Sequence, residues 1–173
     1  MHIIIDGYNL IRQSDRLRHA ERAGLEAGRN RLIEELIRYN RMNPHRITVV
    51  FDGWLDGSPT EEHYRKGGIE IVYSRKGEEA DEVIKRMTRR TGGDTLVVTS
   101  DRDIADTVVR GGGVALSSPQ FEEKIKGAIT GQAIEKEFPD DEPLERVVTP
   151  RKKGPSRKLS KRERKARRAL KKL

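Results

Sequence analysis

Residues 2–10, with the sequence H-I-I-I-D-G-Y-N-L, decide the fold of this chain. Three consecutive isoleucines bounded by the turn signal Asp6-Gly7 predict a short strand that is buried on both faces, and such strands lie at the centre of parallel sheets. A carboxylate at the end of a buried strand is unusual. Because open α/β sheets bind ligands beyond the carboxyl ends of their strands, we expect Asp6 to lie at a binding crevice and Asn9 to help orient it.

The rest of the chain alternates between strand and helix patterns. Strands are predicted at residues 46–51, 69–73, 95–99 and 114–116. Helices are predicted at residues 24–42, 80–90, 104–110 and 119–137, whereas residues 11–22 are ambiguous and residues 54–66 are predicted to form a polar loop. This alternation predicts βαβ units, and therefore an α/β fold with a mostly parallel central sheet of about five strands.

Length and composition limit the class of protein. A chain of 173 residues is predicted to form one domain, and 37% charged against 34% hydrophobic residues indicates a compact core with a solvated segment attached. The absence of cysteine excludes disulfides and thiolate metal sites. No apolar run reaches the length of a membrane span and no signal peptide precedes the first strand, so we expect a cytoplasmic protein.

The net charge of +8 is unevenly divided. Residues 151–173 carry thirteen Lys and Arg residues against one acid, whereas residues 1–150 carry 23 basic against 27 acidic residues. The predicted organisation is an α/β domain at residues 1–137, a Pro- and acid-rich linker at 138–150 and a basic tail at 151–173. Such a tail favours nucleic acid over a membrane as the polyanionic partner, and its composition favours a helix that orders on RNA. The basic residues of the tail are Arg151, Lys152, Lys153, Arg157, Lys158, Lys161, Arg162, Arg164, Lys165, Arg167, Arg168, Lys171 and Lys172.

Five acidic residues are expected at one edge of the predicted sheet. Asp6, Asp52 and Asp101 each follow a buried strand, Asp81 begins a helix, and Asp103 lies two residues beyond Asp101. Each has an ordinary explanation. Asp-Gly is a common turn pair, an acid in the first turn complements the helix dipole, and the spacing from Ser100 to Asp103 fits a capping box.

Taken together, the acids point to a metal site. Clustered carboxylates raise one another's pKa values unless a cation compensates their charge. Oxygen ligands without cysteine or clustered histidine favour Mg²⁺ or Mn²⁺ over zinc, and such ions activate water and clamp phosphodiesters. Asp6, Asp81 and Asp101 are the candidate ligands, with Asp103 as a further one. The candidates for holding these ligands or a phosphate in place are Asn9, Asp52, Thr99 and Ser100.

At these residues the chain resembles the NYN domain, specifically the YacP-like branch of the PIN-like nucleases. The matching motifs are I-D-G-Y-N-L (5–10), V-V-F-D-G (49–53), E-A-D-E-V-I (79–84) and V-V-T-S-D-R-D (97–103), and the resemblance covers about residues 1–137. It implies a PIN-like three-layer α/β/α sandwich and a divalent-metal-dependent ribonuclease. The family's acids correspond to Asp6, Asp81 and Asp101, and Asn9 matches the asparagine of the motif, whereas the position of Asp103 varies. Substrates on the translation apparatus are also implied, since YacP-like members include a ribosome-associated mRNA endonuclease.

Two functions remain open on the sequence alone. The first is an endoribonuclease that hydrolyses RNA phosphodiester bonds, and the second is a non-catalytic RNA- or ribosome-binding protein with the same fold. A phosphatase with an aspartate nucleophile is disfavoured, because Tyr8 stands where the second aspartate of that chemistry belongs. Tyr8, Trp54 and Tyr64 are candidate surfaces for stacking a base, although a single aromatic in a loop is more often simply packed.

Overall fold

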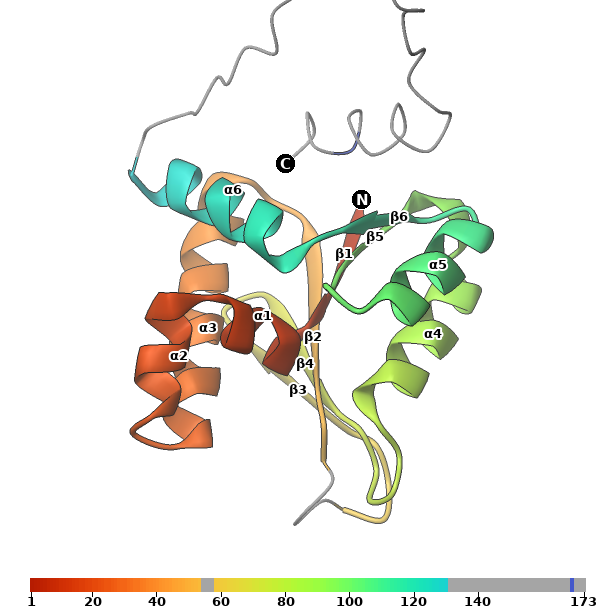
Figure 1. Ribbon diagram of the computed structural model, residues 1–173, viewed down its shortest axis with the longest axis horizontal. Coiled ribbons are helices and arrows are strands. Elements are labelled where there is room, and N and C mark those ends of the chain that lie inside the picture. The colour runs from red at the N-terminus through yellow and green to blue at the C-terminus, as the bar shows by residue number, and fades with distance from the viewer. Residues whose placement is uncertain (54–57, 131–168, 170–173) are drawn as a thin grey trace, which may run out of the picture.

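The computed structural model describes residues 1–53, 58–130 and 169, and these form a PIN-like α/β/α sandwich (Figure 1). The central sheet has the strand order β3-β4-β2-β1-β5-β6. Every pairing is parallel except that of β3 with β4. The strands are β1 (His2–Asp6), β2 (Arg46–Phe51), β3 (Glu62–Lys66), β4 (Ile69–Tyr73), β5 (Thr95–Val98) and β6 (Val114–Leu116). The expected mostly parallel sheet is therefore confirmed, with one strand more than expected.

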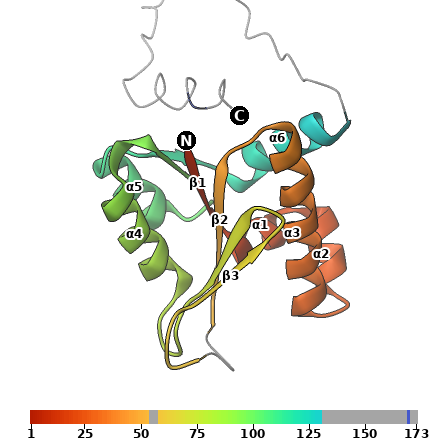
Figure 2. The ribbon, with the colours of Figure 1, turned by 180° about the vertical axis from the view of Figure 1, so that it is seen from behind.

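Helices cover both faces of the sheet (Figure 2). On one face lie α1 (Gly7–Gln13), α2 (Asp15–Glu21), α3 (Leu25–Met42) and α6 (Ser118–Thr130); on the other lie α4 (Ala80–Thr91) and α5 (Arg102–Arg110), with a short 3₁₀ turn η1 (Gly92–Asp94) after α4. Within the part of the chain that the structure describes, no helix is both long and apolar enough to cross a membrane.

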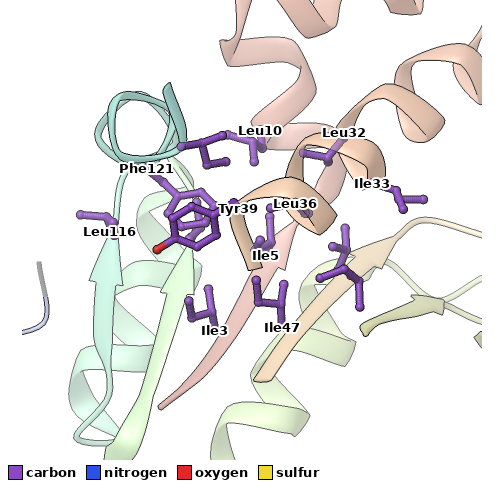
Figure 3. Close-up of a cluster of buried hydrophobic side chains, with 14 of the residues drawn as sticks. Ile3, Ile5, Leu10, Leu32, Ile33, Leu36, Tyr39, Ile47, Leu116 and Phe121 are labelled. Carbon is purple, nitrogen blue, oxygen red and sulfur yellow. The ribbon is translucent and has the colours of Figure 1, made fainter. Parts of the chain in front are cut away.

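Strand β1 is buried from both sides, as its isoleucines predict. Ile3 and Ile5 pack into the core beneath α1, α3 and α6, together with Tyr39 and Phe121 (Figure 3). Ile4 packs into the separate core beneath α4 and α5. Because successive side chains of a strand point to opposite faces, this alternation fixes the register of β1 and the position of Asp6 at its end.

In the first half of the chain the structure resolves one ambiguity and corrects one prediction. Apart from the caps Ser14 and Arg22, the ambiguous residues 11–22 lie in α1 and α2, and Ser14 caps α2 by accepting a hydrogen bond from the Leu17 N–H with its side chain. The predicted polar loop at 54–66 contains strand β3. This strand is the outermost one on its side of the sheet and is largely exposed, so it carries no apolar run. Polar edge strands give no hydrophobic signal in a sequence.

Several predictions fall on residues outside those described. They are Trp54, the end of the last helix at residues 131–137, the linker at 138–150 and the basic tail at 151–173 apart from Ala169. Ala169 is helical and buried, and it belongs to the same core cluster as Ile3 and Ile5.

Glycine is required at position 7 because the ring of Phe51 packs closely against its backbone. Gly7 does not form the turn that the Asp6-Gly7 pair predicts. Helix α1 begins at Gly7 directly after β1, and a Cβ atom at this position would overlap the ring of Phe51. We expect Gly7→Ala to lower the free energy of unfolding by about 1–3 kcal/mol, the usual cost of overpacking a core, as measured by urea denaturation.

The matched control is Gly93→Ala, whose Cβ would meet only the Gly112 carbonyl oxygen at 3.5 Å. This variant is expected to stay within about 0.5 kcal/mol of wild type, as surface substitutions usually do. Equal stability of the two variants would contradict the close packing of Gly7 against Phe51.

Candidate active site

The carboxyl ends of β1, β2 and β5 lie at one edge of the sheet and bring Asp6, Asp52 and Asp101 to it. Asp6 is the last residue of β1, which pairs in parallel with β2 and β5. Asp52 follows β2 directly, and Asp101 lies three residues beyond the end of β5. The parallel arrangement thus produces the common edge that the sequence predicts.

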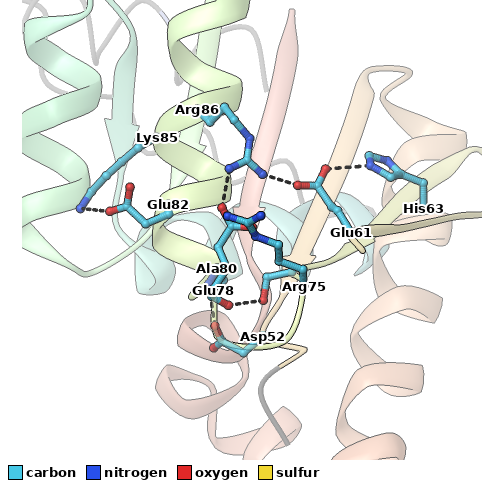
Figure 4. Close-up of polar contacts among 10 residues, drawn as sticks. Asp52, Glu61, His63, Arg75, Glu78, Ala80, Glu82, Lys85 and Arg86 are labelled. Carbon is cyan, nitrogen blue, oxygen red and sulfur yellow. Dashed lines mark hydrogen bonds and ion pairs between the residues drawn. The ribbon is translucent and has the colours of Figure 1, made fainter. Parts of the chain in front are cut away.

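Asp52 fixes the start of α4 at this edge. Its Oδ1 accepts a hydrogen bond of 2.6 Å from the Ala80 N–H, the first residue of that helix (Figure 4). The approach to α4 is fixed further by Arg86, which binds both Glu78 and Glu61. Asp81, the second residue of α4, is therefore positioned by Asp52, and this is the role that Asp52 plays in the structure.

Asp6 is a buried carboxylate with two hydrogen-bond donors. Oδ1 accepts the Asn9 N–H at 3.1 Å, and Oδ2 accepts the Thr99 hydroxyl at 3.2 Å, while the side chain is 8% exposed. Burial raises the pKa of Asp6 to about 6, and the negative charges of Asp81 and Asp52 add to this increase against the lowering effect of the two hydrogen bonds. Asn9 thus orients Asp6 through its backbone N–H group.

Asp81 is half-buried and belongs to the same group of acids. Burial raises its pKa, and the nearby charges of Asp101 and Asp52 raise it further, whereas Lys85 lowers it. The charges of Asp81 and Asp52 raise the pKa of Asp6, and the charge of Asp101 raises the pKa of Asp81. The four carboxylates therefore lie close enough to repel their neighbours.

Asp101 has a second, structural role. Its Oδ1 accepts hydrogen bonds from the Asp103 N–H at 2.7 Å and the Ile104 N–H at 3.1 Å, and so it caps α5. The capping box predicted from Ser100 to Asp103 is therefore wrong, because the helix begins one residue later than that box requires.

Asp103 differs from the other acids because it has a positive partner. Its Oδ2 lies 2.6 Å from Lys85 Nζ, its side chain is 70% exposed, and the ion pair lowers its pKa. To bind a cation at the acidic edge, Asp103 would first have to leave Lys85.

Asn9, Thr99 and Ser100 belong to a hydrogen-bonded frame at this edge, with one further member that sequence reasoning missed. Asn9 Oδ1 accepts from the Ser100 N–H at 3.0 Å and from the Ser118 hydroxyl at 2.9 Å. Thr99 Oγ1 donates to Asp6 and accepts from the Asp101 N–H at 3.1 Å, so it joins two of the acids. The missed member is Ser118, at the start of α6, and the S-S-P sequence at residues 117–119 is a helix-start signal that could have drawn attention to it.

The donor set fits a hard divalent cation held partly through water. Among residues 1–53, 58–130 and 169, no three acidic or histidine side chains stand close enough to form a ready-made metal cluster. In the same residues Asp6, Asp52, Asp81 and Asp101 make no ion pair, while burial and mutual repulsion raise the pKa values of Asp6 and Asp81. Mg²⁺ commonly uses only one or two protein carboxylates and keeps several waters, so this arrangement suits it.

Comparison with known proteins identifies the family. A family model described as the YacP-like NYN domain matches residues 3–172. This chain belongs to the YacP-like NYN domain family. The match extends through the basic residues at 151–172, beyond the region of about 1–137 that carries the sequence motifs. The YacP-like NYN family lies among the PIN-like nucleases, which supports a nuclease in general terms.

Individual relatives agree with this assignment. The protein YacP of Bacillus subtilis (strain 168) is 28% identical over 87 residues, which cover 50% of this chain and 51% of that protein, so the match spans about half the relative's length. Two crystal structures of Rae1 (YacP) from Bacillus subtilis, one of them of a point mutant, superpose with a TM-score of 0.65 each. The mutant is 21% identical in sequence to this chain, and the match covers 75% of this chain and 77% of the mutant chain. The other structure is 22% identical, and the match covers 76% of each chain. These likenesses show the PIN-like fold.

The buried charge of Asp6 is expected to destabilise the metal-free YacP-like protein. Because burial raises its pKa from 3.8 to about 6, the folded protein keeps a proton that the unfolded chain has released between those values. Stability of the metal-free protein therefore falls as pH rises through this window, by up to about 3 kcal/mol. In chelator at about pH 7.5, Asp6→Asn is expected to raise the free energy of unfolding by about 2 kcal/mol.

The control is Asp15→Asn, an exposed carboxylate paired with Arg18 on the surface of α2. Such a pair contributes about 0–1 kcal/mol, so this variant is expected to be neutral or slightly destabilised. A loss of stability in Asp6→Asn under these conditions would contradict the account of Asp6.

Proposed function

We propose that this protein is a divalent-metal-dependent endoribonuclease that hydrolyses RNA phosphodiester bonds at the acidic edge of the sheet. The observation that carries the proposal is the pair Asp6 and Asp81. Asp6 is buried and Asp81 is half-buried, both have raised pKa values, and neither has an ion-pair partner among the described residues. Carboxylates in this state bind a cation in preference to remaining charged and unpaired.

The residues of the site divide the work. Asp6, Asp81 and Asp101 hold Mg²⁺ or Mn²⁺ directly or through water. Thr99 orients the Asp6 carboxylate and accepts from the Asp101 backbone N–H, and Asp52 positions Asp81 through the start of α4. When bound, such a cation supplies an activated water and neutralises charge on the phosphodiester.

Asn9 and Ser100 contribute the polar frame on the other side of the site. Because Asn9 Oδ1 already accepts two hydrogen bonds, from Ser100 and Ser118, its amide N–H₂ is the part suited to donate to a phosphate oxygen. Asp103 stays paired with Lys85 and is only a further candidate ligand of the cation.

The substrate class follows from the charge distribution and the family. Residues 1–150 carry a net charge of −4, which repels RNA, whereas residues 151–173 carry +12 and offset that repulsion. Contacts of the tail with phosphates give affinity and position but not sequence choice. RNA on the ribosome, met in the cytoplasm, is the substrate that the YacP-like resemblance favours.

The test is cleavage of end-labelled RNA, both naked and on ribosomes, with Mg²⁺, with Mn²⁺ and with chelator. Discrete products that require the metal are expected in at least one of the two substrates. Intact RNA in every lane, together with retained binding, would instead favour the alternative of a non-catalytic RNA- or ribosome-binding protein.

A further inference from the structure

A pocket of about 900 Å³ lies directly beside the acidic edge, between α3 and the β3–β4 hairpin. Asp52 and Asp81 form part of its lining, so the pocket and the proposed catalytic site are continuous. Tyr73 and Ile71 of β4 and Tyr64 of β3 lie in its wall. Its volume is within the range of pockets that bind small ligands or single groups of a larger one.

Two of the rings that line the pocket, Tyr64 and Tyr73, belong to a packed aromatic series that continues to Phe51 in the buried core. Phe51 stacks against Tyr73 with centroids 5.7 Å apart, and Tyr64 meets Tyr73 edge to face at 5.9 Å. Tyr64 is the outer ring of this series and is 53% exposed. A ring that packs against a neighbouring ring and is still half exposed offers a surface on which a nucleic-acid base can stack.

Two guanidinium groups lie against tyrosine rings that line the pocket. The Arg29 guanidinium lies 5.5 Å from the Tyr73 ring centroid and donates to Tyr8 Oη at 3.2 Å, and that of Arg12 lies 5.8 Å from the Tyr8 centroid. Neither makes an ion pair with a carboxylate of the described residues, whereas Arg16 and Arg31 both pair with Glu35. The pocket therefore offers positive charge that is not neutralised by an ion pair in this part of the chain.

The other charged residues that line the pocket are four carboxylates and one lysine. Asp52 and Asp81 belong to the acidic edge, Glu79 precedes Asp81 by two residues, and Glu62 accepts a hydrogen bond from the Tyr64 hydroxyl at 3.0 Å. Lys66 also lines the pocket, at the opposite end of β3 from Glu62. A ligand that extends from the acidic edge into the pocket would thus contact both carboxylates and aromatic and basic groups.

We propose that this pocket binds an unpaired nucleotide adjacent to the scissile phosphate, with its base on Tyr64 and its phosphate near Arg12 and Arg29. The proposal rests on the proposed ribonuclease function. Aromatic rings combined with arginine are the usual means of binding unpaired RNA bases. A base inside a duplex is stacked and paired, so it could enter such a pocket only after being flipped out. The pocket consequently makes the enzyme selective for single-stranded positions in RNA.

The experiment measures binding of a fluorescent single-stranded RNA, and of the same sequence in a duplex, by anisotropy. The full-length protein is used in chelator, so that no cleavage occurs, at about 0.15 M salt, which screens long-range attraction. Tyr64→Ala is expected to weaken single-strand binding about 10-fold, the usual effect of removing a stacking ring. Tyr64→Phe keeps the ring and is expected to bind as wild type does.

A second pair of variants tests the guanidinium groups. Arg12→Ala is compared with Arg18→Ala, which removes the same charge from an exposed position on α2 outside the pocket. Arg12→Ala is expected to weaken single-strand binding at least about 5-fold more than Arg18→Ala, because charge-assisted contacts to phosphate are local. Binding of the duplex is expected to change equally in both.

The outcomes separate this proposal from the proposed function. The proposed nucleotide pocket would be contradicted if Tyr64→Ala bound single-stranded RNA as tightly as wild type and the two arginine variants had equal effects. This holds even if the wild-type protein cleaves RNA. Equal losses for single strand and duplex would also overturn it, because they would indicate unselective attraction. Selective losses in a protein that never cleaves RNA would support the pocket and reject the nuclease.

Discussion

Asp81→Asn and Asp101→Asn are each expected to reduce the rate of RNA cleavage at saturating Mg²⁺ by about 10³-fold or more. Both residues lie at the edge where four carboxylates act on one another, and Asp101 is joined to Asp6 through Thr99. Loss of a ligand that positions the cation removes several kcal/mol of transition-state stabilisation, and about 4 kcal/mol corresponds to 10³ in rate. Single-turnover cleavage of labelled RNA measures the effect.

Asp103→Asn is the matched control for these variants. It makes the same chemical change two residues from Asp101, but at a side chain that is exposed and paired with Lys85. We expect its cleavage rate to stay within about 10-fold of wild type, the lower end of the effect of residues that support metal ligands. Asparagine also caps helices well, so Asp101→Asn is expected to keep α5 folded, which circular dichroism checks. Wild-type rates in Asp81→Asn would contradict the assigned site.

Neutralising part of the basic tail is expected to produce the second large effect. Replacing Arg157, Lys158, Lys161, Arg162, Arg164 and Lys165 by glutamine should weaken RNA binding by about 10²-fold and reduce the slope of log affinity against log salt by up to about 4. The measurement is binding of single-stranded RNA across a salt series. Substitution is preferred to deletion of residues 151–173, because Ala169 is buried and belongs to the same core cluster as Ile3.

A control with the same loss of charge removes six exposed arginines from the folded domain. The positions are Arg22, Arg38, Arg41, Arg65, Arg89 and Arg90. If the tail makes the phosphate contacts, this control is expected to change the salt slope by about 1 or less. Equal losses in the two multiple variants would show that only the total charge matters, and an unchanged slope in the tail variant would contradict its role outright.

The buried strands could be predicted from sequence because their burial on both faces leaves an apolar run. Ile3 to Ile5 in β1 and Leu96 to Val98 in β5 are such runs, and both strands lie in the interior of the sheet, with a neighbour on each side. Strand β3 could not be found in this way, since its residues are polar and exposed. The signal that could have found it is Gly67-Gly68, two residues with positive φ that join β3 to β4, as expected of a two-residue hairpin.

The common edge of the acids could be predicted, but the partners of the individual acids could not. Parallel strands necessarily bring Asp6 and Asp52 to one edge. The pairing of Asp103 with Lys85 and of Asn9 with Ser118 depends on how α4, α5 and α6 pack on the sheet. Such contacts join residues far apart in the chain, so no local pattern records them.

The central claim is that Asp6 and Asp81 hold a divalent cation, and direct titration with Mn²⁺ tests it most closely. Electron paramagnetic resonance of free Mn²⁺ gives the affinity, with Mg²⁺ as competitor, for the wild-type protein and for Asp6→Asn, Asp81→Asn and Asp103→Asn. The account predicts a Mn²⁺ site for which Mg²⁺ competes. Its Mn²⁺ affinity is expected to fall at least about 10-fold in Asp6→Asn and in Asp81→Asn and to change little in Asp103→Asn. Equal Mn²⁺ affinity in wild type, Asp6→Asn and Asp81→Asn would contradict it.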